Sequence, residues 1–140
     1  SNYGAAKMAL VGLMQTLSLE GMKYNIHVNC LAPTASTAMT ENILPPPVLE
    51  LMKPEYVSPA LLKLVGEDAP TRAILCSGAG HLARAYVTLT AGEYIGGGVD
   101  MADKIVTRWD KISDRAHESV PDSGMSQAQQ EIAAAMNAKG

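Results

Sequence analysis

A tyrosine and a lysine stand four residues apart at the start of the sequence, as Tyr3-Gly-Ala-Ala-Lys7. In a helix, residues four apart lie on one face, so the phenol and the ammonium would point into the same space. A phenol ordinarily ionises near pH ~10, and a cation held beside it favours the phenolate and lowers its pKa. The pair therefore predicts a general acid and base for an alcohol or ketone oxygen. Because the spacing alone is common, an exposed tyrosine beside a solvated lysine is the alternative interpretation.

The element that must position this pair is a helix predicted over residues 4–23. Apolar residues recur in it at helical spacing and predict a buried stripe, formed by Leu10, Leu13, Met14 and Leu17. A short apolar run at 26–32, bounded by Asn25 and Pro33, then predicts a strand. The pair would thus lie on a helix that leads directly into a sheet.

The middle of the chain continues the alternation of helix and strand. A hydroxyl-rich loop is predicted at 33–41, and the helical stretch at 42–52 is interrupted by three consecutive prolines. A helix within 54–66 begins near Ser58, and a second apolar strand follows at 72–77. Two strands are too few for a stable parallel sheet, so we expect them to be neighbours at one side of a larger one. The predicted fold class is α/β.

The C-terminal part is more polar and richer in glycine. Residues 85–95 predict a hairpin around Ala91-Gly92, and the glycines at 96–98 end it. A helix is predicted over 100–117, with Trp109 as an anchor in a core or an interface. After a linker at 119–125, residues 126–138 predict a polar helix.

The residues around Tyr3 and Lys7 resemble the short-chain dehydrogenase/reductase family. In that family Y-x-x-[SA]-K opens a long helix, and the next strand ends in a pattern like R-V-N-x-[IV]-x-P-G. The segment N-I-H-V-N-C-L-A-P keeps Asn29 and Pro33, but His27 stands where an arginine is common and Thr34 replaces the usual glycine. The loop 33–41 and the later K-P-E-Y-V-S-P resemble one branch, the dehydrogenase part of peroxisomal multifunctional enzyme type 2 and its bacterial relatives. Members of that branch act on (3R)-hydroxyacyl-CoA.

This resemblance implies the C-terminal part of a Rossmann-like doubly wound parallel sheet, with a helical and hairpin extension. Its domains would be 1–80, the half of a dinucleotide-binding domain with catalytic helix, substrate loop and last strand, then the extension 81–125 and a polar tail 126–140. The family's Gly-rich cofactor turn and catalytic serine would lie upstream of Ser1. The glycines at 78–80 and 96–98 do not replace that turn, because neither gives G-x-G-x-x-G between a strand and a helix.

The resemblance also assigns roles. Tyr3 would be the proton donor in reduction and the acceptor in oxidation, and Lys7 would bind the nicotinamide ribose. Cofactor contacts would come from Pro33 at the loop start and from backbone groups of Thr34, Ala35 and Ser36.

A hydroxyl of the loop, on Thr40 or alternatively Thr37, would reach the cofactor amide or phosphate. A hydroxyl that only stabilises a turn is the alternative for both residues. The stretch 38–52 would be a mobile lid over the substrate, with Met39, Ile43 and Leu44 against it.

The implied parent protein is an NAD- or NADP-dependent oxidoreductase acting on a hydroxyl or keto group, with a 3-hydroxyacyl-CoA among the candidate substrates. We expect it to be a homodimer or tetramer, cytoplasmic if bacterial and peroxisomal if eukaryotic. The piece with this sequence would be inactive alone. The alternative is a non-catalytic oligomerisation or docking fragment that makes a dimer contact through 4–23 and 72–77.

Composition excludes several other classes. The net charge is −3 without a basic run, which argues against nucleic acid, and no apolar stretch is long enough to span a membrane. The three histidines are scattered, so no metal site is expected. Cys30 and Cys76 lie in apolar runs and predict buried thiols in a reducing compartment.

Overall fold

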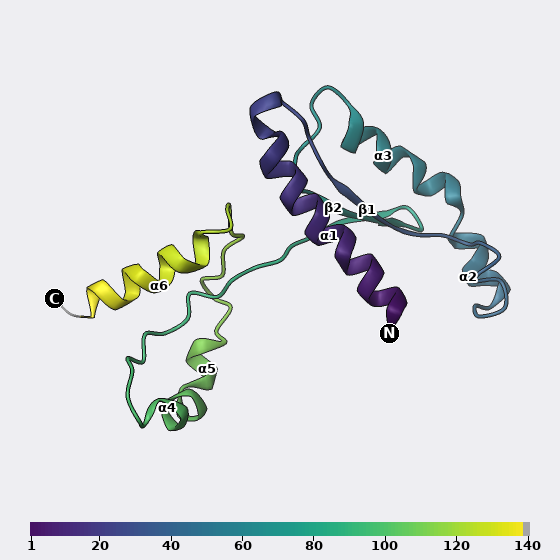
Figure 1. Ribbon diagram of the computed structural model, residues 1–140. Coiled ribbons are helices and arrows are strands. Elements are labelled where there is room, and N and C mark those ends of the chain that lie inside the picture. The colour runs from purple at the N-terminus through teal and green to yellow at the C-terminus, as the bar shows by residue number, and fades with distance from the viewer. Residues whose placement is uncertain (139–140) are drawn as a thin grey trace. The chain divides into compact units, whose positions relative to one another are not determined.

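The computed structural model describes residues 1–138, drawn in Figure 1. The chain divides into two compact units, Ser1–Tyr86 and Val87–Gly140. Each unit is described here by itself. The three-part division at residues 80 and 125 stays a prediction.

The first unit is built on a three-stranded sheet in the order β1-β2-β3. Its strands are β1 (Cys30–Thr34), β2 (Ile74–Gly78) and β3 (His81–Ala85). The first two pair in parallel and the last two antiparallel. The predicted α/β class and the parallel pairing of two neighbouring strands are therefore confirmed.

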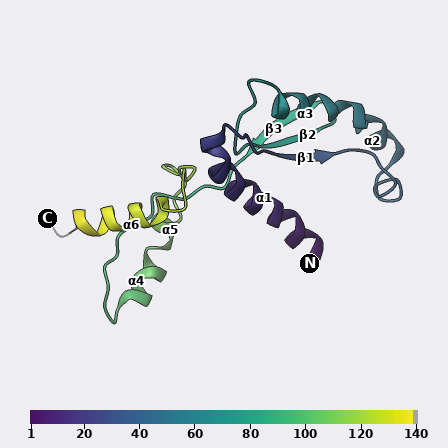
Figure 2. The same cartoon turned by 45° about the horizontal axis from the view of Figure 1, so that its top comes forward.

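Helices cover both faces of this sheet. They are α1 (Asn2–Gly21), the 3₁₀ turn η1 (Met22–Tyr24), α2 (Pro46–Leu51), the 3₁₀ turn η2 (Pro54–Tyr56) and α3 (Ser58–Val65). Figure 2 shows α1 on one side of the strands and α2 and α3 on the other. The arrangement is that of a doubly wound sheet. α3 begins at Ser58 as predicted, with Pro59 in its first turn, where its missing N–H has no helical partner.

Strand β1 lies further along the chain than predicted and includes Pro33, which we had placed in a loop. The Cys30 N–H donates to the Ala73 carbonyl at 2.8 Å, so Cys30 turns its backbone groups toward β2. By alternation, Leu31 and Pro33 turn theirs toward the open edge of β1. Proline has no backbone N–H, but at position 33 an N–H would face the open edge and would have no partner in the sheet. An edge strand therefore tolerates a proline at this position.

The predicted hairpin at 85–95 is wrong, and a different hairpin joins β2 to β3. Its loop is Ala79-Gly80, with φ of 50° and 76°, as in a type I′ turn. β3 escaped prediction because all five of its residues are exposed and give no alternating pattern. Within the described 85–95 stretch, the pairing beyond β3 is a single bridge from Leu89 to Ser119.

The predicted buried stripe of α1 is mostly exposed. Met14 is 2% exposed, but Leu10, Leu13 and Leu17 are 52%, 53% and 41% exposed. The reason is the position of α1 beside the open edge of β1, where the three leucines line a groove and are not covered by a further element of this unit.

The second unit holds the short helices α4 (Met101–Thr107) and α5 (Trp109–Ile112) and the longer α6 (Ser126–Asn137). The polar helix predicted at 126–138 is confirmed, whereas the helix predicted over 100–117 is broken at Arg108. Trp109 is 60% exposed, so its place in a core is wrong and its place in an interface stays a prediction. Glycines at 96 and 98 have positive φ, but the hairpin that they were expected to end is not formed.

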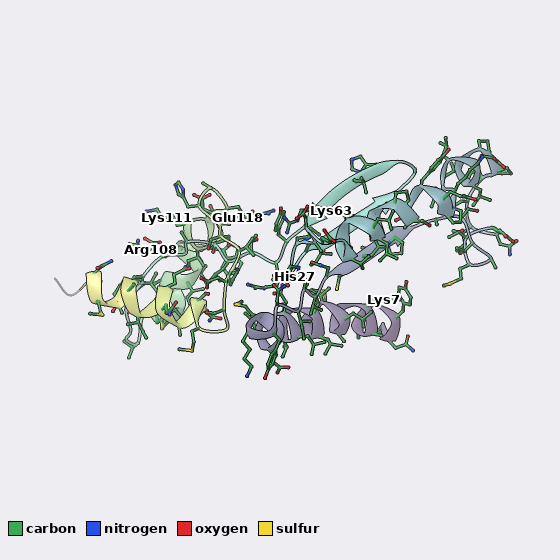
Figure 3. The ribbon with its side chains drawn as sticks, turned by 90° about the horizontal axis from the view of Figure 1, so that it is seen from above. Lys7, His27, Lys63, Arg108, Lys111 and Glu118 are labelled. Atoms are coloured by element: carbon green, nitrogen blue, oxygen red, sulfur yellow. The ribbon has the colours of Figure 1, made fainter. Side chains whose placement is uncertain are left out.

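Side-chain hydrogen bonds hold the second unit together. Gln130 of α6 donates through Nε2 to the carbonyls of Thr90 and Ala91, both at 2.8 Å, and the Thr90 hydroxyl donates to the Ile112 carbonyl at 2.9 Å. Arg108 and Lys111 pair with Glu93. Figure 3 labels both of these cations.

Among residues 1–138, none of the helices has the length and apolar character needed to cross a membrane. Both cysteines are free thiols, half-buried rather than fully buried, and burial raises the pKa of the Cys30 thiol.

We predict that Gly78→Ala destabilises the first unit by about 1–3 kcal/mol, because a new atom must fit into a closed space. A Cβ at Gly78 would lie 2.7 Å from the Thr34 carbonyl oxygen and 2.9 Å from the Thr34 Cβ on β1. Urea denaturation of the full chain, followed by circular dichroism, measures the change. The matched control is Gly12→Ala on α1, where a Cβ meets nothing within 4 Å and should stabilise by roughly 0.5–1 kcal/mol. Equal effects at the two glycines would contradict the prediction.

A second prediction concerns pH and the second unit. Arg115 donates through Nε and Nη2 to both carboxylate oxygens of Glu118, at 2.8 and 2.9 Å, and the Thr88 hydroxyl donates at 3.1 Å. These bonds hold the pKa of Glu118 below its ordinary value of 4.5, and the bond from Arg115 has the largest effect. Since the folded pKa is the lower one, the carboxylate stabilises the fold above pH 4.5 and the contribution is lost as the pH falls through the folded value.

The measurement is a carbon-13 NMR titration of the Glu118 carboxyl. Arg115→Ala should raise the midpoint toward 4.5. Lys104→Ala, which breaks the separate pair with Asp100, should leave it unchanged. If Arg115→Ala leaves the midpoint unchanged, Arg115 is not the cause of the lowered pKa of Glu118.

Candidate active site

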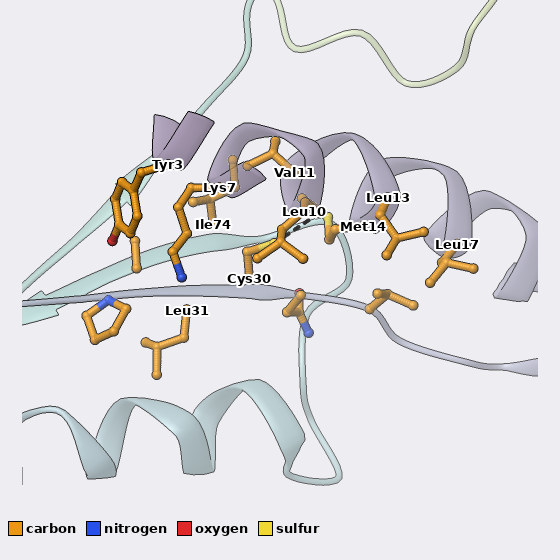
Figure 4. Close-up of a pocket in the computed structure, with 14 residues that line it drawn as sticks. Tyr3, Lys7, Leu10, Val11, Leu13, Met14, Leu17, Cys30, Leu31 and Ile74 are labelled. Carbon is orange, nitrogen blue, oxygen red and sulfur yellow. Dashed lines mark hydrogen bonds between the residues drawn. The ribbon is translucent and has the colours of Figure 1, made fainter. Parts of the chain in front are cut away.

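Tyr3 and Lys7 lie on one face of α1, as their spacing predicts. The Lys7 Nζ is 5.4 Å from the centre of the Tyr3 ring, a cation–π distance. Figure 4 shows both side chains pointing from α1 toward β1. Tyr3 is 65% exposed, so the phenol is open to solvent on the described surface. The pair is thus preformed and accessible.

The pair stands at one end of a groove of about 570 Å³ between α1 and β1. Apolar side chains of α1 form one wall, and the segment Val28–Pro33 forms the other. The residues that complete the lining are Leu10, Val11, Leu13, Met14, Leu17 and Ile74. A pocket that is largely apolar with a few polar groups at one end is the usual form of a small-molecule site.

Of the predicted cofactor residues, the groove brings Lys7 and Pro33 together. Thr34, Ala35 and Ser36 follow directly on the chain but do not line it. The Ser36 N–H donates to the Met52 carbonyl at 2.6 Å, so the two ends of the segment 36–52 are joined by a backbone hydrogen bond. The backbone of Ser36 is therefore already engaged in this state.

The hydroxyls of Thr40 and Thr37 are used locally. Thr40 Oγ1 accepts from the Thr37 N–H at 2.8 Å and donates to the Thr37 carbonyl at 3.0 Å, while Thr37 Oγ1 accepts from the Met39 N–H at 3.3 Å. These bonds correspond to the turn-stabilising alternative, and a contact of either hydroxyl with a cofactor stays a prediction. In the predicted lid, Met39 and Ile43 are 74% and 75% exposed and Leu44 is half-buried.

Asn29 has a structural part that the sequence analysis missed. Its Nδ2 donates to the carbonyls of Leu64 at 3.2 Å and Pro70 at 2.7 Å, and its Oδ1 accepts from the Ala73 N–H at 3.0 Å. One side chain thereby joins β1 to the end of α3 and to the start of β2. The available signal was an amide inside an otherwise apolar run, which must find polar partners when half-buried.

Within residues 1–138, no group of three or more histidine, cysteine or acidic residues lies close enough to hold a metal ion. The groove thus offers a phenol, an ammonium and backbone groups as its chemistry. Such a set can transfer a proton and hold hydroxyl or amide groups.

Comparison with known proteins adds sequence evidence. Residues 1–46 match the family model described as short chain dehydrogenase. The resemblance to that family is confirmed. The match includes Tyr3, Lys7, Asn29 and Pro33, and it ends within the predicted lid.

Longer similarities extend over most of the chain. A short-chain type dehydrogenase/reductase of Mycobacterium tuberculosis is 44% identical over 115 residues, 81% of this chain and 40% of that protein. Peroxisomal multifunctional enzyme A of Dictyostelium discoideum is 40% identical over 99% of this chain, and peroxisomal multifunctional enzyme type 2 of Mus musculus is 39% identical over 86%. The chain spans 31% and 17% of those two proteins.

A solved structure resembles the fold. Full-length peroxisomal multifunctional enzyme type 2 from Drosophila melanogaster matches 98% of this chain, and 25% of its own, with a TM-score of 0.78. Its sequence identity is 23%, so the likeness shows the fold alone. It agrees with the α/β, Rossmann-like assignment.

We predict that Asn29→Ala destabilises the first unit by about 2–3 kcal/mol, because it leaves the Ala73 N–H and two carbonyls without their partners. Asn29→Asp keeps the acceptor but sets a carboxylate oxygen against the Leu64 and Pro70 carbonyls. The introduced carboxyl should therefore have a raised pKa, so the loss relative to the unmodified chain is smallest below pH ~4 and grows as the pH rises. Urea denaturation at several pH values measures both effects. Asn42→Ala, in the exposed loop, is the control and should change little.

Proposed function

We propose that this chain carries the tyrosine–lysine side of the active site of an NAD(P)-dependent oxidoreductase of the short-chain dehydrogenase type. The observation that carries the proposal is the placement of Tyr3 and Lys7 on one face of α1, directed at β1 beside Pro33. The family match over residues 1–46 and dehydrogenases among the relatives support it.

The residues present fit a nicotinamide and its ribose. Among the described residues, the Lys7 ammonium lies over the Tyr3 ring, and its N–H donors are available to ribose hydroxyls. Pro33 and the backbone of Thr34–Ser36 would lie along the nicotinamide, with Thr40 or Thr37 as the hydroxyl partner. NAD and NADP are both open as cofactors.

The chemistry is the interconversion of an alcohol and a ketone. A bound nicotinamide would accept a hydride from the substrate carbon in oxidation and donate one to that carbon in reduction. In oxidation Tyr3 accepts the hydroxyl proton, and in reduction it returns a proton to the carbonyl oxygen, while Lys7 would hold the ribose hydroxyls beside it.

The substrate class we propose is a 3-hydroxyacyl thioester such as a hydroxyacyl-CoA. Relatives named as peroxisomal multifunctional enzymes and as a peroxisomal hydratase-dehydrogenase-epimerase favour it. They also favour a peroxisomal location if the source is eukaryotic. A cytoplasmic location if the source is bacterial stays a prediction. Met39, Ile43 and Leu44 of the lid would contact the acyl group, and the parent enzyme would be a homodimer or tetramer.

A second candidate function is a non-catalytic docking or oligomerisation fragment. The exposed leucines of α1 and the open edge of β1 favour it, since such surfaces associate readily. It predicts association without cofactor binding. Size-exclusion chromatography with and without NAD(H) or NADP(H) separates the two functions.

The test of the proposed function uses the protein from its native source, whatever its length, assayed with NAD(P)⁺ and 3-hydroxybutyryl-CoA. Tyr3→Phe should lower kcat by about 10²–10⁴-fold, because it removes the proton carrier. Lys7→Ala should raise the KM for the cofactor. Tyr24→Phe and Lys23→Ala are matched controls, since Lys23 also lies over a tyrosine ring at 4.9 Å but outside the groove. Full activity of Tyr3→Phe would overturn the assignment.

A further inference from the structure

Helix α1 is held on the sheet by its C-terminal half. Its buried residues are Met14, Ser18 and Gly21. In the N-terminal half, Tyr3 is 65% and Met8 59% exposed. The half that carries the candidate catalytic pair is therefore supported from one end. Its direction depends on contacts made further along the helix.

One such contact is a hydrogen bond across 57 positions of sequence. Arg72 donates through Nε to the Gln15 side-chain oxygen at 2.7 Å, and both residues are half-buried. A donor that carries a charge makes this bond stronger than a neutral one. Another side-chain bond from the sheet to α1, Cys30 Sγ to the Leu10 carbonyl at 3.7 Å, has only a weak donor.

The backbone around Arg72 is joined directly to the segment that leads into β1. The Arg72 N–H donates to the Val28 carbonyl at 2.8 Å. The next residue, Ala73, donates to Asn29 Oδ1 at 3.0 Å and accepts from the Cys30 N–H at 2.8 Å. Arg72 thus connects α1, through its side chain, to β1, the strand that contains Pro33 of the groove.

Arg72 also has a backbone conformation that an arginine seldom adopts. Its φ is 59°, in the left-handed region that glycine occupies without strain. A residue other than glycine in such a conformation is a reason to look for a role of its side chain. Here the side chain makes the contact with Gln15.

We propose that Arg72 is a positioning residue, which acts through Gln15 to set the direction of α1 so that Tyr3 and Lys7 face β1 beside Pro33. The inference rests on the proposed function for the catalytic role of the pair. It adds a residue that lies 65 positions beyond Lys7 in sequence and outside the groove lining.

The geometry explains how a contact at Gln15 reaches the pair. A helix behaves as a rigid rod over this length, and Tyr3 lies about 18 Å from Gln15 at 1.5 Å per residue. At 100° per residue, Lys7 is offset from Gln15 by roughly 80° around the axis. Together with the buried Met14 and Ser18, the contact at Gln15 therefore restricts both the tilt and the rotation of the end that carries Tyr3.

The structural test measures the direction of α1 relative to β1 and β2 by residual dipolar couplings of backbone N–H groups in the 140-residue chain. Arg72→Gly removes the side chain and relieves the backbone strain, so the fold should be kept. Both Arg72→Gly and Gln15→Ala should turn or loosen α1, and the effect of the double variant should be smaller than the sum of the two single effects. Arg72→Lys should restore most of the order. Arg84→Ala is the control, because Arg84 stacks on Tyr86 of the same unit.

The kinetic test uses the native enzyme with the same substitutions. Arg72→Gly and Gln15→Ala should lower kcat about 10–100-fold, because a displaced proton donor slows the chemical step. The KM for the hydroxyl substrate should stay within about twofold, and Arg72→Lys should recover most of kcat. A purely structural role would lower thermal stability without this split between kcat and KM.

Four outcomes decide the matter. The expected couplings and the selective loss of kcat together support the proposal. An unchanged direction of α1 in Arg72→Gly and Gln15→Ala overturns it, and so does a turned α1 with unchanged kcat. If the unmodified enzyme lacks NAD(P)-linked activity, the proposed function fails, and Arg72 then positions no catalytic pair even where the couplings show that it directs α1.

Discussion

The hydrogen bonds that join β1 to the chain entering β2 are the constraint on which the first unit depends. Asn29 occupies their centre, because one amide partners the last turn of α3, the following loop and the Ala73 N–H. Buried backbone groups need partners, and a shift of β1 would leave several of these unpaired at once. The parallel register of β1 and β2 and the place of α3 follow from one side chain.

The same junction controls the site indirectly. Arg72 donates its own N–H to the Val28 carbonyl, the next residue, Ala73, donates to Asn29, and the Arg72 side chain reaches α1. The groove has α1 and β1 as its walls, so its width depends on how this junction holds the helix. A motif residue such as Asn29 therefore shapes the groove through the backbone groups that it partners.

Local signals predicted much of this fold. α1, α3 and α6 have helical periodicity or caps within their own sequence, and the two parallel strands are apolar runs between turn residues. The depth of burial was not predictable in the same way. The stripe that contains Leu10, Leu13 and Leu17 indicates that one face of α1 is apolar. Whether that face is buried depends on the width of the sheet beneath it, which is set by residues distant in sequence.

Pro33 and Ala79 show a second limit of local reasoning. Proline argues against a central strand, but β1 is an edge strand in the described sheet, and edge position is a tertiary property. Ala79 takes a positive φ that glycine or asparagine would adopt more readily, so the I′ turn has only half of its usual signature. Because β3 is exposed throughout, neither the turn nor the strand has a sequence pattern that predicts the hairpin.

The chemistry of the site was more readable than its surroundings. A spacing of four residues on a helix is enough to predict that Tyr3 and Lys7 share a face, and the ring contact agrees. What spacing does not convey is exposure. Proton transfer between a phenol and a substrate oxygen proceeds best where water is excluded, yet Tyr3 is 65% exposed. The loop closed at its base by Ser36 and Met52 carries Met39 and Ile43 in solvent, and burying them gains free energy. Covering the groove would therefore favour the loop and the chemistry together.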